Sequence, residues 1–420
     1  MKKLLYIYMF ILMVLPISVN ASGETLIKVG NNYYGDLQEA IDNASSKDTI
    51  SLITDISLSD TININKTVNI NLNGNTISAK EKVFLIEGGS LHLSGNGTVK
   101  ETNPNYGAIM IKGSTDPNDI DYSTLKVDKN VTLEGWSGIF INHTNSKSYG
   151  TLINFSGKIN AVDDIKGDSG IGIYINGSIQ DDNNSPIINI NSDSIINSTG
   201  VGLYLAGSSN TNIDNSKITG QDSGISIKSG TLNIKSGTIT CNGIDRTPTQ
   251  GNNNGVNPSG ATIQIESNDQ YAGNIKLNIS GGTLISKHSH VIYEYIVSDN
   301  KSNITQLNLS GGTYKSPANK DIFSLSNSFL TKQPKFIKGG KYTSNPEEYL
   351  IEGYTSNLLD DLYVVTTSAI KEEFNMMKEQ NNNTIKTILS ILVIIITIVI
   401  VYLNKTKILK IIKLNRHNWL

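Results

Sequence analysis

Apolar and polar residues alternate with a period of two over most of the chain, in two families of similar segments. One family places a glycine before alternating aliphatic residues, and the other ends on a Gly-Gly pair. Because successive side chains of a strand point to opposite faces, each segment predicts a half-buried strand. The glycines that mark the copies are Gly138, Gly170, Gly200, Gly224 and Gly260 in the first family, and Gly281, Gly311 and Gly339 in the second.

A single coil of such strands cannot bury its aliphatic face, whereas a stack of coils buries it continuously. The copies recur at about 24–36 residues, which is shorter than the repeat of a propeller blade. We therefore expect an all-β fold, a right-handed parallel β-helix (solenoid) over residues 22–366. It should have about 11–14 coils and a length of roughly 55–65 Å.

Both ends of such a solenoid need a cover, because exposed strand edges invite association. Apolar residues at helical spacing follow Asp36, a good N-cap residue, and predict a short N-terminal capping helix. Aromatic residues gather after the last Gly-Gly pair and predict a C-terminal cap. The residues concerned are Leu37, Ala40, Ile41 and Ala44 at the first end, and Tyr342, Tyr349 and Tyr354 at the second.

The termini predict a single-pass membrane protein. Residues 1–21 have the charged start, apolar run and small-residue end of a signal peptide, with an uncleaved anchor as the alternative. Residues 387–403 are nearly all aliphatic and predict a C-terminal transmembrane helix, after a juxtamembrane stalk at 367–386. The basic tail 404–420 should stay in the cytoplasm. We therefore expect a cell-membrane protein with an extracellular N-terminal ectodomain.

Composition narrows the classes of function. The chain is 17% charged with a net charge of -2, which argues against a nucleic-acid partner. Its single cysteine, Cys241, excludes an intrachain disulfide and a cysteine-based zinc site. We expect no cofactor and no metal.

Three stretches are similar to a known family: GDLQEAIDNASSKDTISLITDISLSDTININKTVNINLNGNTIS near the start, the repeated LNISGGTL, and the closing GGKYTSNPEEYLIEGYTS with LYVV. Together they resemble the pectate-lyase-like β-helix modules of large surface proteins from Gram-positive bacteria, over about residues 33–366. The closing motif more often has Asp-Pro where this chain has Asn345-Pro346, and no cell-wall sorting motif is visible. The resemblance implies the fold, and either polysaccharide cleavage or a surface role without known chemistry.

Catalytic residues are hard to assign. A lyase needs a base beside calcium-binding carboxylates, and the ectodomain has one arginine, Arg246, in an irregular loop. A hydrolase needs two carboxylates at a fixed separation, but consecutive aspartates on a strand point apart. The aspartates Asp163, Asp164, Asp168, Asp181 and Asp182 are predicted to be loop solubilisers, with a weak calcium site as the alternative. His288 and His290 lack an identifiable third ligand and are predicted to lie at the surface.

Aromatic residues supply the candidate binding site. With Ile173 and Leu203 pointing inward, Tyr174 and Tyr204 should turn outward on adjacent rungs, beside Phe140 on the preceding coil. Such rings can contact an extracellular glycan or a cell-surface protein, or they can stabilise the β-helix by stacking on one another. We expect adhesion or glycan binding without catalysis. The alternative is a membrane-tethered polysaccharide lyase or glycoside hydrolase.

Overall fold

The computed structural model describes residues 26–142, 148–177, 184–248, 255, 257–268, 270–271, 274–297, 301–368, 402 and 405. The predicted signal peptide, stalk, transmembrane helix and cytoplasmic tail lie almost wholly outside these residues. Within the described part, no helix is both long and apolar enough to cross a membrane.

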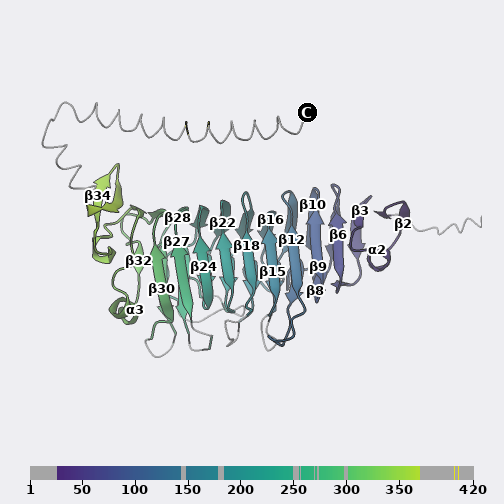
Figure 1. The fold of residues 1–420 in the computed structure, drawn as a ribbon, viewed down its shortest axis with the longest axis horizontal. Coiled ribbons are helices and arrows are strands. Elements are labelled where there is room, and N and C mark those ends of the chain that lie inside the picture. Colours follow the sequence, from purple (N-terminus) through teal and green to yellow (C-terminus); the bar gives the residue numbers. More distant parts are fainter. Residues whose placement is uncertain are drawn as a thin grey trace, which may run out of the picture.

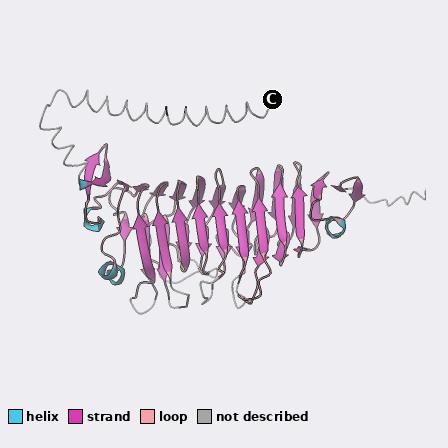
Figure 2. Ribbon diagram, in the orientation of Figure 1, coloured by secondary structure: helices cyan, strands magenta, loops and turns pink. Residues whose placement is uncertain are grey.

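Three parallel sheets, stacked coil upon coil, form a β-helix (Figures 1 and 2). The first sheet contains β3 (Thr49–Leu52), β6 (Thr67–Asn71), β9 (Ser90–Ser94), β12 (Ser123–Val127), β15 (Thr151–Phe155), β18 (Ile187–Ile190), β21 (Asn210–Ile213), β24 (Gly230–Ile234), β27 (Ile275–Ile279) and β30 (Ile304–Leu309). The second contains β4 (Ile56–Leu58), β7 (Thr76–Ala79), β10 (Gly97–Glu101), β13 (Val131–Gly135), β16 (Lys158–Ala161), β19 (Ile195–Ser198), β22 (Ser216–Gly220), β25 (Gly237–Cys241), β28 (Thr283–Ser286), β31 (Thr313–Lys315) and β33 (Gly340–Tyr342). The third contains β5 (Ile62–Ile64), β8 (Phe84–Glu87), β11 (Ile109–Lys112), β14 (Ser137–Ile141), β17 (Ile171–Ile175), β20 (Val201–Leu205), β23 (Ser223–Ile227), β26 (Ile263–Ser267), β29 (Ile292–Ile296) and β32 (Phe323–Ser324).

The interior is a continuous stack of aliphatic side chains, as the alternation predicts. Ile173 and Leu203 are fully buried and pair in register on β17 and β20. A stack of this kind buries apolar surface on every coil, and that burial is the main favourable contribution to folding.

The number of coils is at the lower end of the predicted range of about 11–14. Among the described residues the third sheet has 10 strands and the second has 11 parallel strands from β4 to β33, so 10 complete coils are followed by a partial eleventh. Equivalent asparagines on adjacent strands of the first sheet lie between 21 and 45 residues apart, so coil length varies more than the repeat spacing suggests. The longest coils have long connections between their strands, and these connections add residues but no further strand to the sheets.

The glycines of the first repeat family are also aligned differently from the alignment that the sequence predicts. Ile139 pairs with Ile173 and Ile173 with Leu203, so Gly138 lies opposite Gly172 and Gly202, not Gly170 and Gly200. A Cβ on Gly202 would lie 2.4 Å from Cγ2 of Ile218 and 2.5 Å from the carbonyl oxygen of Gly224. Glycine is therefore needed where the third sheet passes close to the core side chains of the second.

We expect Gly202→Ala to lower the free energy of unfolding by about 1–3 kcal/mol, because the added methyl group overpacks this contact. The measurement is denaturant unfolding followed by circular dichroism. Ser51→Ala, on the partly exposed side of β3, is the control and should change the free energy by less than about 0.5 kcal/mol. Equal stability of the two variants would contradict the close approach.

The caps form at both ends of the solenoid. The N-terminal cap comprises the antiparallel pair β1 (Ile27–Val29) and β2 (Asn32–Tyr34) and the helix α2 (Leu37–Asn43), whose N-cap is Asp36 as predicted. The C-terminal cap comprises α3 (Asn327–Lys332), the 3-10 helix η1 (Glu347–Tyr349), and the antiparallel strands β34 (Tyr354–Leu359) and β35 (Leu362–Thr367). Tyr342 stacks on Tyr314 with ring centroids 4.7 Å apart, which confirms an aromatic cap.

Candidate functional site

The predicted aromatic residues share one column on the outer face of the third sheet. Phe140 pairs with Tyr174, and Tyr174 with Tyr204, on β14, β17 and β20. The ring centroids of each pair are 4.9 Å apart, and the Tyr174 and Tyr204 planes differ by only 8°. The prediction that these side chains line up on adjacent rungs is confirmed.

The prediction that both tyrosines face solvent is wrong for Tyr204, which is only 2% exposed. It lies in a second apolar cluster outside the solenoid core, here called the outer cluster, formed by Trp136, Ile171, Val201, Tyr204 and Ala206. Ile171 and Val201 lie two residues before Ile173 and Leu203, so strict alternation at period two predicts that they point inward as well. Both belong to the outer cluster instead, at the first positions of β17 and β20.

The stacking leaves little ring surface for a ligand. Tyr174 has Phe140 against one face and Tyr204 against the other, and Trp136 lies 5.3 Å away, measured between ring centroids. Burial raises the pKa of both tyrosines, so each keeps its proton well into the alkaline range. The geometry therefore favours the stacking role that the sequence left open, and only ring edges remain for contact with a glycan.

A buried ion pair between Lys228 and Glu266 lies beside Gly255 and Tyr271, the two residues that cover Tyr204. Lys228 Nζ lies 2.9 Å from Glu266 Oε1 and donates to the carbonyl oxygen of Gly255 at 2.8 Å; the two charged side chains are 3% and 2% exposed. Tyr204 also donates to Gly255, and Lys228 lies 5.0 Å from the ring centroid of Tyr271. Lys228 is buried and donates to two acceptors, so it stabilises the packing around Tyr204 and is not accessible to a ligand.

The residues weighed for catalysis or metal binding are not brought together. Within the part of the chain that the structure describes, no three His, Cys, Asp or Glu side chains could hold a metal ion; Asp181 and Asp182 lie outside it. Arg246 pairs with Asp222 at 3.7 Å, while burial raises the pKa of that carboxyl despite the arginine. His290 bonds the carbonyl of Asp321 through Nδ1 and stacks near Tyr293.

The outer face of the first sheet carries a feature that we did not predict, a column of asparagine side chains. Four hydrogen bonds of 2.9 to 3.0 Å link the amides of five consecutive rungs, and in each bond an amide donates to the one on the preceding rung. Asn308 continues the column in register on β30. We call this set the amide column; its members are Asn154, Asn189, Asn212, Asn233, Asn278 and Asn308, all half-buried.

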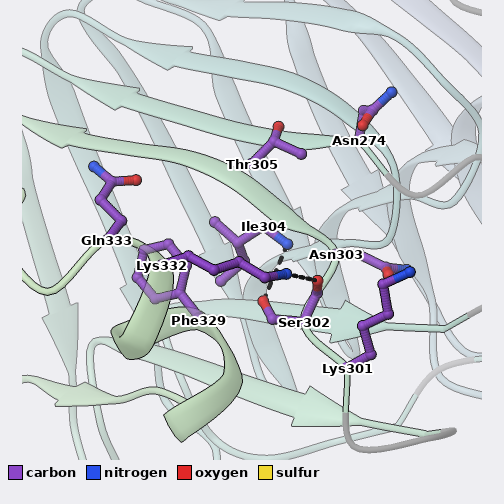
Figure 3. Close-up of a pocket in the computed structure, with 9 residues that line it drawn as sticks. All are labelled: Asn274, Lys301, Ser302, Asn303, Ile304, Thr305, Phe329, Lys332 and Gln333. Atoms are coloured by element: carbon purple, nitrogen blue, oxygen red, sulfur yellow. Dashed lines mark hydrogen bonds between the residues drawn. The ribbon is translucent and has the colours of Figure 1, made fainter.

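In the part of the chain that the structure describes, three hollows lie along the same face, between the start of β18 and α3. The largest, about 690 Å³, lies between the start of β30 and α3, and Lys301 and Lys332 line it (Figure 3). A second, of about 190 Å³, shares Asn274 with the first and adds Lys276. The third, of about 260 Å³, lies over Asn278 and Asn308 of the amide column. The hollows are open, and asparagine, serine and lysine side chains line each of them. Groups of these kinds can form hydrogen bonds with a hydroxyl-rich ligand.

A sequence signal for the amide column exists. The second repeat family places asparagine between two aliphatic residues, in TLNIKSG, KLNISGG and QLNLSGG. At period two that asparagine must face outward on every coil, so the copies predict a row of amides. The lysine-lined hollow has no such signal, because it requires α3 to fold beside β30.

Comparisons with protein-family models, with curated proteins and with solved structures find no match to this chain, so the resemblance noted above remains a prediction.

Proposed function

We propose that the chain is a membrane-anchored cell-surface protein whose right-handed β-helix binds extracellular glycans without cleaving them, through the outer face of its first sheet. This keeps the function expected from the sequence but moves the binding site away from Phe140, Tyr174 and Tyr204. The membrane anchor is part of the proposal and rests on the composition of residues 387–420.

The observation that carries the proposal is the amide column. A carboxamide has two N–H donors and a carbonyl oxygen with two lone pairs. Asn212 donates one N–H to Asn189 and accepts one hydrogen bond from Asn233. One N–H and one lone pair of its amide therefore remain for solvent or ligand. Sugar hydroxyls both donate and accept, and they match such a row. The rungs repeat at about 4.8 Å, which presents the amides as a regular track.

The competing explanation is that the amide column only stabilises the stacking of coils, as asparagine ladders do in cross-β structures. Both explanations predict some loss of stability when an amide is removed. They differ in position, because the hollow over the amide column is lined by Asn233, Asn278 and Asn308, whereas the column starts at Asn154 on β15.

The test uses two matched double variants in the same column, screened as full-length protein in mild detergent against a glycan array. Asn278→Thr/Asn308→Thr removes amides that line a hollow, and Asn154→Thr/Asn189→Thr removes amides outside the hollows. We expect the first pair to weaken glycan binding at least about tenfold, or 1.4 kcal/mol. The second pair should bind like the native chain.

Two results would overturn the proposal. If both pairs lower the melting temperature and neither changes glycan binding, the amide column is structural only. If the bound glycan is shortened with turnover, measured as new chain ends, the protein is an enzyme.

A further inference from the structure

We infer that the hollow between β30 and α3 binds an anionic group, carboxylate or phosphate, of the hydroxyl-rich polymer that lies on the first sheet. The inference rests on the proposed function, since it assigns the charge of the same ligand. It can nevertheless fail while a neutral glycan still binds.

The hollow brings together two cations from different elements. Lys332 lies in the last turn of α3, and Lys301 lies in the segment that leads into β30 (Figure 3). Lys332 Nζ donates to the carbonyl oxygen of Ser302 at 3.4 Å, which uses one of its three donors. Within the described chain, neither lysine is within ion-pair distance of a carboxylate.

The charged residues around the hollows are all positive, although the whole chain is close to neutral with a net charge of -2. None of the described residues that line the three hollows is an aspartate or a glutamate. Lys235 lines the third hollow but pairs with Asp214 at 3.3 Å. That leaves Lys276, Lys301 and Lys332 as the cations available to a ligand.

Helix electrostatics alone do not explain this arrangement. A lysine in the last turn of a helix is favoured by the helix dipole, and this accounts for Lys332. Lys301 and Lys276 lie outside α3 and gain nothing from its dipole. These three lysines line two adjoining hollows that contain no described carboxylate, and an anionic ligand would supply the opposite charge.

The surroundings favour a polymer over a membrane surface. Ile304 and Phe329 line the hollow but are only 2% and 1% exposed, so little apolar surface is available to an acyl chain. Polar groups lead away from the hollow along the sheet: Asn274 is shared with the next hollow, and Lys276 and Asn278 lie on the same side of β27. An extended chain with repeated hydroxyl and anionic groups fits this track.

The test measures equilibrium binding of full-length protein to three soluble polymers of equal length. They are a polyuronate, a glycerol phosphate polymer and a neutral glucan. We expect at least one of the anionic polymers to bind more tightly than the glucan, and the one that binds identifies the anionic group. Lys301→Gln/Lys332→Gln should weaken that binding at least about tenfold.

The matched control, Lys315→Gln/Lys341→Gln, removes the same charge from exposed lysines on the second sheet. It should change the affinity less than about twofold. Equal weakening by both pairs would overturn the inference, because the attraction would then be non-specific.

Tighter binding to phosphatidylglycerol vesicles than to any soluble polymer would overturn it as well. Glucan binding that depends on Asn278 and Asn308 but not on the lysines would overturn the anionic subsite and leave the proposed function standing. Binding to none of these probes, with a glycan still bound on the array, would also overturn the anionic subsite alone.

Discussion

We expect Lys228→Met to lower the free energy of unfolding by about 3–5 kcal/mol, because it leaves the Glu266 carboxylate buried without its partner. The side chains of Lys228 and Glu266 are 3% and 2% exposed, so water cannot replace the lost ammonium. The loss should appear in urea unfolding as an earlier transition.

Two comparisons make this result specific. Lys228→Met/Glu266→Leu removes both charges and should recover much of the loss, since an apolar pair of similar volume is often tolerated in place of a buried ion pair. Lys235→Met breaks the pair with Asp214, whose side chains are 76% and 47% exposed, and should cost less than about 1 kcal/mol. If the Lys228 and Lys235 variants were equally stable, the ion pair between Lys228 and Glu266 would not be buried as described.

The second large effect concerns the core of a single rung. Leu203→Ala should cost about 2–5 kcal/mol, because the neighbouring coils hold the stack open around the cavity. The sequence predicts that its neighbour Tyr204 faces outward, but Tyr204 is buried in the outer cluster. Tyr204→Ser should therefore cost about as much, roughly 3–5 kcal/mol.

Thermal unfolding followed by circular dichroism can compare Leu203→Ala and Tyr204→Ser directly with Tyr174→Ser. Tyr174 is half-buried and contributes mainly ring stacking, so its loss should be smaller than that of Tyr204. A Tyr204 variant with native stability would contradict the burial of this side chain.

The sequence predicts the fold well because alternation at period two depends on local geometry. It identifies Ile173 and Leu203 as core residues and Asp36 as the start of a helix, and the structure agrees. It fails at Ile171 and Val201, which belong to the outer cluster although their spacing from Ile173 and Leu203 predicts the solenoid core.

The sites are harder to predict because they depend on segments that are distant in sequence. Tyr204 is covered by contacts from Gly255 and Tyr271, and no local pattern reports such a cover. The hollow beside β30 forms only because α3 folds back against that strand. The amide column is different, since its repeated asparagines are visible in the sequence once outward positions are compared from coil to coil.

A crystal structure of the protein with the strongest glycan from the array would show whether the outer face of the first sheet binds it. We expect sugar density along β24, β27 and β30, with hydroxyls within hydrogen-bond distance of Asn278 and Asn308. Sugar density over the edges of Phe140 and Tyr174 on the third sheet, with the amide column bare, would contradict it.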